Sequence, residues 1–333
     1  MRVAVVASLT TVNSVYRALP LLSLRARGHA VHVDADGQAL LAGKLPGCDV
    51  VHVYRHQHPR VRRALHALRE AGTAIVWDND DYPFPAQAKP GEARARQAQA
   101  EIVRMLPLAH LVTTTSPLLA EQYRTWGAAD VRVVENFLPR HFSRPPAARR
   151  SPGVLVGWVA AGEHQRDAER LGLRGTLERL LATHPGMRVA TIGVRLKLPP
   201  ERYAHAEIVE YRELPDHIGR FDVGIAPIAD VPFNRAKSNV KVKEYGALGV
   251  PWLASPIGPY AGFGEAQGGR LVPDDGWHDA LDRLIRDAEA RRRLGAAGRR
   301  WAEGQRVERN LASWEGAIEQ ALANARGRVA EPA

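Results

Sequence analysis

The sequence has one cysteine, no long apolar run and few lysines. The single cysteine, Cys48, excludes an internal disulfide and a cysteine-rich metal site. No apolar run reaches the roughly 18 residues that a membrane-spanning helix needs. The apolar stretch over residues 1–7 is too short for a signal peptide, so we expect a buried strand there and a cytoplasmic protein. A length of 333 residues suffices for two domains.

Positive charge is abundant and unevenly distributed. The formal net charge of +10 indicates an anionic partner, which is nucleic acid, a membrane surface or a phosphorylated small molecule. The alternative explanation is a genome that favours arginine codons. Three of the six lysines, however, fall between residues 237 and 243. Codon usage does not produce that cluster, which makes the segment a candidate anion site.

Short apolar runs alternate with helical patterns over residues 1–134. They predict strands at 3–7, 30–33, 50–54, 74–77, 111–114 and 131–134, with helices near 16–27, 61–70 and 91–106. A proline- and arginine-rich stretch without periodicity, residues 139–152, then has the composition of a linker. A second series predicts strands at 154–159, 188–192, 207–209, 223–226 and 252–254, helices at 177–182 and 241–248, and mostly helical chain from 276 to about 323.

This alternation predicts an α/β fold with two Rossmann-like parallel-sheet domains, residues 1–145 and 152–305. Open sheets of this kind bind ligands beyond the carboxyl ends of their strands, so we expect a cleft between the domains. The first strand-to-helix turn, residues 8–14, contains no glycine and therefore lacks the dinucleotide fingerprint. Thr10 and Asn13 are candidates to face the cleft, and the alternative is helix capping by Asn13 or Ser14.

An acidic string, Asp78-Asn79-Asp80-Asp81, follows the predicted strand that ends at Trp77. Carboxylates in this position indicate a metal site, a catalytic base or acceptors for sugar hydroxyls. Their mutual repulsion is expected to raise the pKa of at least one of them. The alternative is a solvated turn that caps the next helix. No second acidic cluster completes a metal shell, so a metal is not expected.

The segment from Asn234 to Glu244 carries the strongest signal. Its four cations, Arg235, Lys237, Lys241 and Lys243, have no acid among them, and Ser238 is a candidate N-cap. Lysines in the first turns of a helix oppose its dipole at a cost of roughly a few tenths of a kcal/mol each. The arrangement becomes favourable when an anion occupies the helix N-terminus.

On a continuous helix Lys237, Lys241 and Glu244 share one face, because they stand at i, i+4 and i+7. A diphosphate would suit the cations and ribose hydroxyls would suit the carboxylate. The alternative is a solvated basic helix in which Lys241 and Glu244 form an i, i+3 pair. Apolar flanks at 223–227 and 247–251 favour a helix beside the sheet.

This segment resembles the donor site of retaining GT-B glycosyltransferases of the family 4-like group. Members carry a glutamate on such a helix, then a small-residue run with a Gly-Val-Pro-like turn, then Ser-x-x-Gly; here these are Glu244, residues 247–251 and residues 255–258. The resemblance implies that Glu244 binds the donor ribose. A second glutamate common in the group is replaced by Ala236, and residues 233–238 look like the version of a bacterial subgroup.

Weaker similarity covers most of the chain. The run from Gly157 to His164 and Asp167 resembles the start of the second domain, where a loop approaches the donor phosphate; a surface histidine is the alternative for His164. Asn136 stands where relatives have an asparagine before the linker, and a final helix, residues 306–325, would pack back on the first domain. The resemblance places the donor against Glu244, Arg235, Asn234, Ser238, Gly157, His164 and Gly258.

The resemblance implies transfer of a sugar, with retention, from a nucleotide diphosphate donor to an unidentified acceptor. UDP is the first expectation for the nucleotide and GDP the second, and no cofactor beyond the donor is expected. Lys237 and Lys241 would stabilise the leaving diphosphate without a metal. The candidate catalytic carboxylates are Asp80 and Asp81, and the candidates to face acceptor or sugar are Asp78, Thr10, Asn13 and Arg17. The alternative for Arg17 is an ordinary surface helix arginine.

Other functions fit the same fold, because fold does not fix function. One is a GT-B nucleotide-sugar epimerase or a phosphorylase, and another is a non-catalytic binder of a phosphorylated ligand or nucleic acid. Nucleic acid is not expected, since the cationic segment has only Phe233 and Tyr245 for base stacking. A peripheral membrane contact through arginines would suit a lipid-linked acceptor. The sequence does not predict the oligomeric state.

Overall fold

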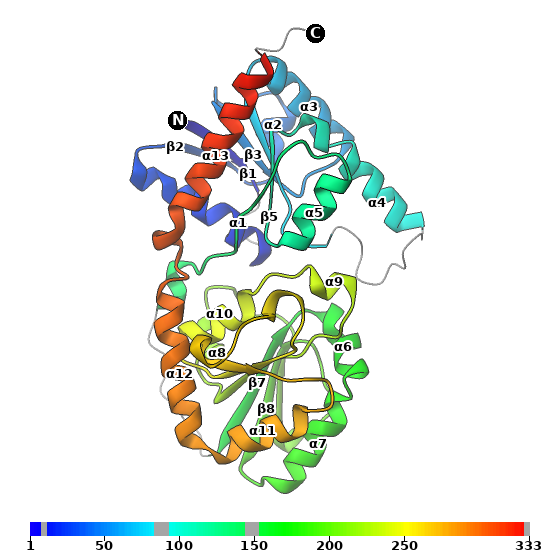
Figure 1. Ribbon diagram of the computed structural model, residues 1–333, viewed down its shortest axis with the longest axis vertical. Helices are drawn as coiled ribbons and strands as arrows, with labels where there is room; N and C mark the ends of the chain where they lie inside the picture. The colour runs from blue at the N-terminus through cyan, green and yellow to red at the C-terminus, as the bar shows by residue number, and fades with distance from the viewer. Residues whose placement is uncertain (8–11, 83–92, 144–152, 330–333) are drawn as a thin grey trace. The chain divides into compact units, whose positions relative to one another are not determined.

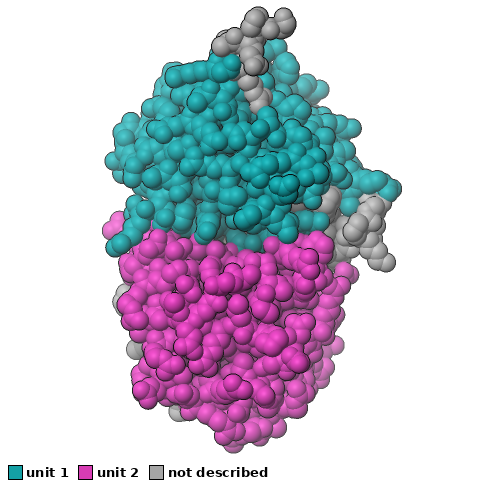
Figure 2. Space-filling view, in the orientation of Figure 1, with its two compact units in different colours: residues 1–137, 236–238, 307–333 teal, residues 138–235, 239–306 magenta. Residues whose placement is uncertain are grey.

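The computed structural model describes residues 1–7, 12–82, 93–143 and 153–329 (Figure 1). The chain forms two compact units, which Figure 2 colours separately. Unit 1 contains residues 1–137, 236–238 and 307–333, and unit 2 contains residues 138–235 and 239–306. Among the described residues, no helix has the length and apolar character needed to cross a membrane.

Unit 1 is built on a six-stranded sheet in which every pairing is parallel, in the order β2-β1-β3-β4-β5-β6. Strands β3 and β4 are buried along their whole length, as strands covered on both faces should be. The strands are β1 (Arg2–Val6), β2 (Ala30–Asp34), β3 (Val50–Tyr54), β4 (Ala74–Asp78), β5 (Leu111–Thr114) and β6 (Val131–Val133). All six strands predicted for this part of the chain are present.

Helices cover both faces of this sheet because alternate strand residues point to opposite sides. Val3 and Val5 join a core under α1 (Val12–Ser23) and α13 (Val307–Val329). Ala4 and Val6 join a second core, to which the other helices contribute: α2 (Gln38–Leu41), α3 (Pro59–Glu70), α4 (Ala93–Val103) and α5 (Pro117–Thr125). The last helix of the chain, red in Figure 1, therefore completes the first unit.

Unit 2 contains a second six-stranded parallel sheet, in the order β12-β11-β10-β7-β8-β9. The strands are β7 (Val154–Ala160), β8 (Met187–Gly193), β9 (Tyr203–Ala206), β10 (Val223–Ala226), β11 (Trp252–Ala254) and β12 (Gly269–Leu271). The predicted strand at 207–209 is wrong, because the paired strand ends at Ala206 and Ile208 is 90% exposed. The pairing of Ile192 with Ala206 is the last of that ladder.

The helices of unit 2 again lie on both sheet faces. The large core on one face lies under α6 (Gln165–Arg170), α7 (Leu173–Thr183) and α11 (Trp277–Arg286). On the other face lies α10 (Val240–Ala247), which contacts α8 (Leu214–Ile218) and α12 (Ala288–Glu303). The short α9 (Pro232–Arg235) precedes α10 beyond the carboxyl end of β10. Each unit is therefore a doubly wound α/β domain whose strand ends share one edge.

Candidate functional site

A buried carboxylate organises the carboxyl edge of the unit 2 sheet. Asp167 lies in the first turn of α6 and is 5% exposed. Its Oδ1 accepts hydrogen bonds from Asn234 Nδ2 at 2.8 Å and from the backbone N–H of Ala229 at 3.2 Å. Its Oδ2 lies 2.6 Å from His164 Nδ1. One carboxylate thus joins the loop after β7 to the loop and helix after β10.

This contact fixes the orientation of His164. A carboxylate accepts hydrogen bonds, so Nδ1 of the imidazole carries the proton that it donates to Asp167. Nε2 has no partner among the described residues, and the side chain is 12% exposed. His164 therefore presents one ring nitrogen to incoming ligand while a buried anion holds the other. His164 stands at a helix start, as the sequence alternative had it, but its side chain is largely buried and is held by Asp167.

Helix α10 begins one residue later than Ser238 would require as N-cap. The helix starts at Val240, so Asn239 occupies the N-cap position, and its side chain makes no capping hydrogen bond. The predicted N-cap at Ser238 is therefore wrong. The first turn of α10 also contains no acidic residue. A helix N-terminus of this kind favours an anionic ligand.

Lys241 and Glu244 face each other one turn apart on α10. The Lys241 ammonium lies 3.0 Å from Glu244 Oε2, and Glu244 is fully buried whereas the Lys241 side chain is 24% exposed. The neighbouring Lys243 is also fully buried. The predicted i, i+3 pair therefore exists, but the helix is not the solvated one of the sequence alternative.

Lys237 does not share that helix face. It precedes α10 and belongs to unit 1, where its ammonium lies 3.4 Å from Asp81 Oδ2. The predicted alignment of Lys237, Lys241 and Glu244 on one helix face is wrong because α10 starts after Lys237. Arg235 is half exposed and pairs with Asp230 at 2.5 Å. Of the predicted cluster, only Lys241 combines position on α10 with access.

Tyr245 and Tyr260 tie this helix to the rest of the edge. The Tyr245 hydroxyl donates to the Ile225 carbonyl at 3.0 Å and accepts from the Val159 N–H at 3.2 Å, so it anchors α10 to β10 and β7. Burial raises the pKa of Tyr260, and the charges of Glu244 and Asp167 raise it further. Tyr260 is thus close enough to both Glu244 and Asp167 for the charge of each carboxylate to act on it.

The two predicted donor glycines have different surroundings. Gly258 adopts a left-handed φ of +50°, and a Cβ there would lie 2.7 Å from the Arg235 Cα, so glycine lets the loop after β11 approach α9. Gly157 lies within β7, where a Cβ would lie 2.1 Å from the Phe221 ring. Glycine at position 157 therefore lets Phe221 pack against β7, and its contact with the donor stays a prediction.

A buried ion pair stands at the corresponding edge of unit 1. Arg17 of α1 donates from Nε and Nη2 to the two Asp78 oxygens at 2.9 and 2.7 Å, and both side chains are fully buried. Thr113 donates to Asp78 at 2.7 Å, and the Trp314 ring lies 4.5 Å from the guanidinium carbon. Burial, the largest single effect, would raise the pKa of Asp78, but the charges and hydrogen bonds of Arg17 and His52 together outweigh it, and the net pKa is lowered.

Arg17 and Asp78 therefore serve the interior of unit 1. Every Asp78 oxygen is engaged, and Arg17 uses its remaining nitrogen for the Val134 carbonyl at 2.5 Å and Asn136 Oδ1 at 3.0 Å. The prediction that these two side chains face acceptor or sugar is wrong, and so is the alternative of a surface arginine. The sequence held one signal, since the residues that follow Arg17 in its helix, 18–22, are all apolar.

Asp80 and Asp81 are held by cations that the sequence did not connect to them. Asp80 Oδ1 accepts from the Tyr54 hydroxyl at 2.7 Å and from Arg55 at 2.6 Å. Arg55 also lies 3.5 Å from Asp81, and it is a non-glycine residue with positive φ, 56°. The solvated acidic turn of the sequence alternative is wrong. Among the described residues, no cluster of histidine, cysteine and acidic side chains has the arrangement of a metal site.

The remaining predicted residues lie at the start of α1. Thr10 falls outside the described residues, and Asn13 is the second residue of α1. Because α1 begins at Val12, neither Asn13 nor Ser14 is its N-cap, and that alternative is wrong. In unit 2 the structure joins His164, Asp167 and Asn234 in one hydrogen-bonded group and pairs Lys241 with Glu244. In unit 1 it groups Asp80 and Asp81 with Arg55.

Comparison with solved structures identifies the fold. A sucrose-phosphate synthase from Thermosynechococcus elongatus matches with a TM-score of 0.71 at 14% identity, over 97% of this chain and 99% of that one. The E. coli trehalose-6-phosphate structure bound with UDP-2-fluoro glucose matches with a TM-score of 0.65 at 14% identity, over 96% and 99%. A putative UDP-N-acetylglucosamine 2-epimerase from Listeria monocytogenes matches with a TM-score of 0.56 at 13% identity, over 96% and 97%.

These likenesses confirm the predicted GT-B architecture of two Rossmann-like parallel-sheet domains. A scan of the sequence against protein-family models finds no match, and a comparison with curated proteins finds none either.

Proposed function

We propose that the protein is a glycosyltransferase that moves a sugar from a nucleotide diphosphate donor to an acceptor. One observation carries the proposal. Helix α10 starts without a side-chain cap at the carboxyl edge of the unit 2 sheet, with Lys241 in its first turn and a buried Glu244 one turn later. A helix N-terminus at the carboxyl edge of such a sheet favours an anion, and a carboxylate one turn later can accept hydrogen bonds from hydroxyl groups.

The donor diphosphate would occupy the N-terminus of α10, between Lys241 and the outward nitrogen of His164. Asp167 and Asn234 position the imidazole rather than touch the donor, since both are buried behind it. Glu244 would accept hydrogen bonds from the ribose hydroxyls. It is covered by Lys241 at 3.0 Å, so binding requires the ammonium to turn from the carboxylate to the phosphate.

The chemistry follows from where charge develops. As the bond between the anomeric carbon and the β-phosphate oxygen breaks, its electron pair remains on the diphosphate, and nearby cations and N–H groups stabilise it. Lys241 would supply positive charge and the helix terminus would supply N–H groups, without a metal. Asp80 and Asp81 are the proposed carboxylates for acceptor or sugar hydroxyls, with Lys237 beside Asp81. Retention at the anomeric carbon is part of the proposal by family resemblance.

UDP is the proposed nucleotide and GDP the second candidate. The E. coli structure that shares the fold holds UDP-2-fluoro glucose, which supports the preference. A second function has a specific observation in its favour, because a putative UDP-N-acetylglucosamine 2-epimerase shares the fold over 96% of this chain. An epimerase would convert the sugar nucleotide by itself, whereas the transferase consumes it only when an acceptor is present.

The test is a thermal-shift panel of nucleoside diphosphates and nucleotide sugars. A ligand at 100 times its Kd stabilises the folded state by about 2.7 kcal/mol. We expect a clear rise in Tm with one diphosphate series. Lys241→Gln and Glu244→Gln should abolish that rise, while the exposed residues changed in Lys44→Gln and Glu289→Gln should leave it intact.

Two outcomes would contradict the proposal. One is the absence of a shift with every diphosphate, and the other is an equal shift in the α10 variants and their controls. The Tm of each variant without ligand shows whether the substitution has damaged the fold. Consumption of the bound sugar nucleotide in the absence of acceptor would favour the epimerase.

A further inference from the structure

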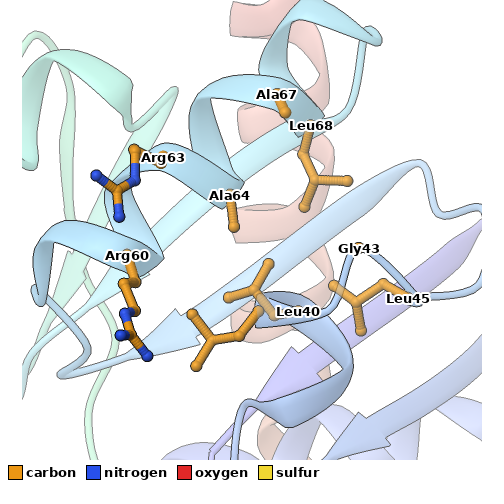
Figure 3. A pocket seen from close by; sticks show the side chains of 9 residues that line it. Leu40, Gly43, Leu45, Arg60, Arg63, Ala64, Ala67 and Leu68 are labelled. Carbon is orange, nitrogen blue, oxygen red and sulfur yellow. The ribbon is translucent and has the colours of Figure 1, made fainter.

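Unit 1 has a groove between α2 and α3 that the proposed sugar transfer does not use. Its volume is about 640 Å³, and Figure 3 shows the side chains that line it. Four leucines form its apolar part: Leu40, Leu41, Leu45 and Leu68. Leu41 is 40% exposed, so part of this apolar surface faces solvent. No acidic residue is among those that line the groove.

Charge and apolar surface are separated along this groove. Arg60 and Arg63 stand one turn apart at the start of α3, and in Figure 3 they lie at one end of the groove. Ala64, Ala67 and Leu68 continue the same helix face away from them. Both arginines are exposed, and neither guanidinium has a hydrogen-bond or ion-pair partner among the described residues. Other arginines of α3 are engaged, since Arg62 pairs with Glu101.

Because the arginines lie at one end of the groove and the leucines at the other, the groove favours a ligand with one charged end and one apolar end. Two unpaired guanidinium groups one turn apart suit a phosphate, which each can bind through parallel N–H groups. A free phosphate or nucleotide would leave the leucine end uncovered. An uncharged apolar ligand would leave the arginines without a counter-ion. The molecule that satisfies both ends has a phosphate head and an apolar chain.

We propose that this groove binds a phosphate-headed lipid. The head lies between Arg60 and Arg63, and the first part of the chain covers Leu41, Leu45 and Leu68. The start of α3 follows the carboxyl end of β3, so the head lies on the same sheet edge as Asp80 and Asp81. The groove is formed by unit 1 residues alone, and the proposal does not depend on nucleotide binding.

Vesicle binding tests the proposal with the full-length protein. Co-sedimentation is measured on vesicles of phosphatidylcholine alone and of equal parts phosphatidylcholine and phosphatidylglycerol. We expect binding only to the anionic vesicles. Each arginine near such a surface contributes about a fivefold gain, so Arg60→Gln with Arg63→Gln should lower the partition coefficient about 30-fold. The matched control changes two exposed arginines of α12, Arg292→Gln with Arg300→Gln, and should bind almost as well as the parent protein.

A second variant separates lipid from phosphate. Leu41→Asn keeps both arginines and changes a partly exposed side chain, so it should fold and yet bind the anionic vesicles several-fold more weakly. Millimolar inorganic phosphate should not displace the parent protein from vesicles, because the ion replaces only the head. If phosphate displaced the protein, or if Leu41→Asn bound the vesicles as well as the parent protein does, the groove would bind only the phosphate group. Either result would overturn the proposal.

Equal loss in the α3 and α12 double variants would also overturn it, because net charge alone would then explain the binding. The nucleotide thermal shift is measured on the same variants and should be unchanged. That readout shows that the α3 variant is folded, and it keeps a failure of the lipid site distinct from a failure of the proposed sugar transfer.

Discussion

Asp78 and Arg17 illustrate what a fully buried charge pair does to the stability of unit 1. Each oxygen of Asp78 and each side-chain nitrogen of Arg17 has a hydrogen-bond partner within the unit. Such a pair gains little over apolar packing, but loss of one partner leaves an uncompensated charge in a medium that solvates it poorly. The stability of unit 1 therefore depends on keeping both members.

We expect Asp78→Asn to lower the free energy of unfolding by about 3–5 kcal/mol at pH 7. The folded-state pKa of Asp78 is lowered, so the contribution of the pair is complete above the unfolded-state pKa of about 4 and is lost as the pH falls through the folded-state value. The difference between parent and variant should thus hold from pH 5 to 8 and shrink below pH 4. Urea unfolding across that range measures it.

The exposed pair of Arg2 and Asp49 provides the control. Their side chains are 63% and 33% exposed, so Asp49→Asn should change stability by less than about 1 kcal/mol. An Asp78→Asn variant as stable as Asp49→Asn would show that water reaches the buried pair. A difference that grows below pH 4 would contradict the sign of the pKa change.

Sequence reasoning identified the acidic string after β4 but assigned it the wrong partners. Asp78 pairs with Arg17 from α1, and Asp80 pairs with Arg55 from the end of β3. These contacts depend on the strand order β1-β3-β4. It brings together Arg17 and Asp78, which are 61 positions apart in the sequence, and Arg55 and Asp80, which are 25 positions apart. Short motifs contain no information on that order. His164 and Asp167, by contrast, are three positions apart in the sequence, so a single helical turn brings them into contact.

At the scale of elements, the loop after β11 and helix α9 must approach closely for the donor edge to form. Gly258 has a φ of +50°, and an added Cβ would meet the Arg235 backbone at 2.7 Å. Gly262 also has a positive φ, +83°, but nothing lies within 4 Å of its added Cβ. Both glycines therefore have a positive φ, but only Gly258 lies so close to another backbone segment that a Cβ would clash with it.

We expect Gly258→Ala to weaken nucleotide binding and to cost about 1–3 kcal/mol of stability beyond Gly262→Ala, because the clash moves α9 as well as straining the turn. Gly262→Ala should cost roughly 1 kcal/mol from its φ alone and leave binding intact. Urea unfolding and the nucleotide thermal shift measure the two effects. If the two substitutions lowered the free energy of unfolding equally, the contact between residue 258 and α9 would not contribute to stability.

Prediction of elements worked where a buried apolar run is continuous and failed where the element is short. Strands such as β3 and β7 were predicted within a residue or two of their ends. The three-residue β12, which contains Gly269 and Arg270, carries no apolar run and was missed. The eight-residue α10 begins too late to include Lys237, and its start depends on packing beside β10 and β7 through Tyr245.

At the scale of the whole chain, the last helix belongs to the first unit. Trp314 of α13 is 1% exposed and packs against Arg17 and against the edge of the His52 ring, with centroids 5.6 Å apart. In the same helix, Asn324 donates a hydrogen bond to the His110 carbonyl and Glu315 forms an ion pair with Arg27, so both contact other parts of unit 1. A change in α13 should therefore be felt by strands at the other end of the sequence.

Two tryptophans test this division with matched chemistry. Trp314 in unit 1 and Trp277 in unit 2 are both 1% exposed, and the indole nitrogen of each is buried without a hydrogen-bond partner. Replacement by alanine should cost about 3–5 kcal/mol in either unit. Trp314→Ala should speed amide hydrogen exchange in β1 and β3 and leave β7 and β8 protected, whereas Trp277→Ala should do the reverse. Equal loss of protection in both sheets with either variant would show that the two units unfold as one, despite their separate cores.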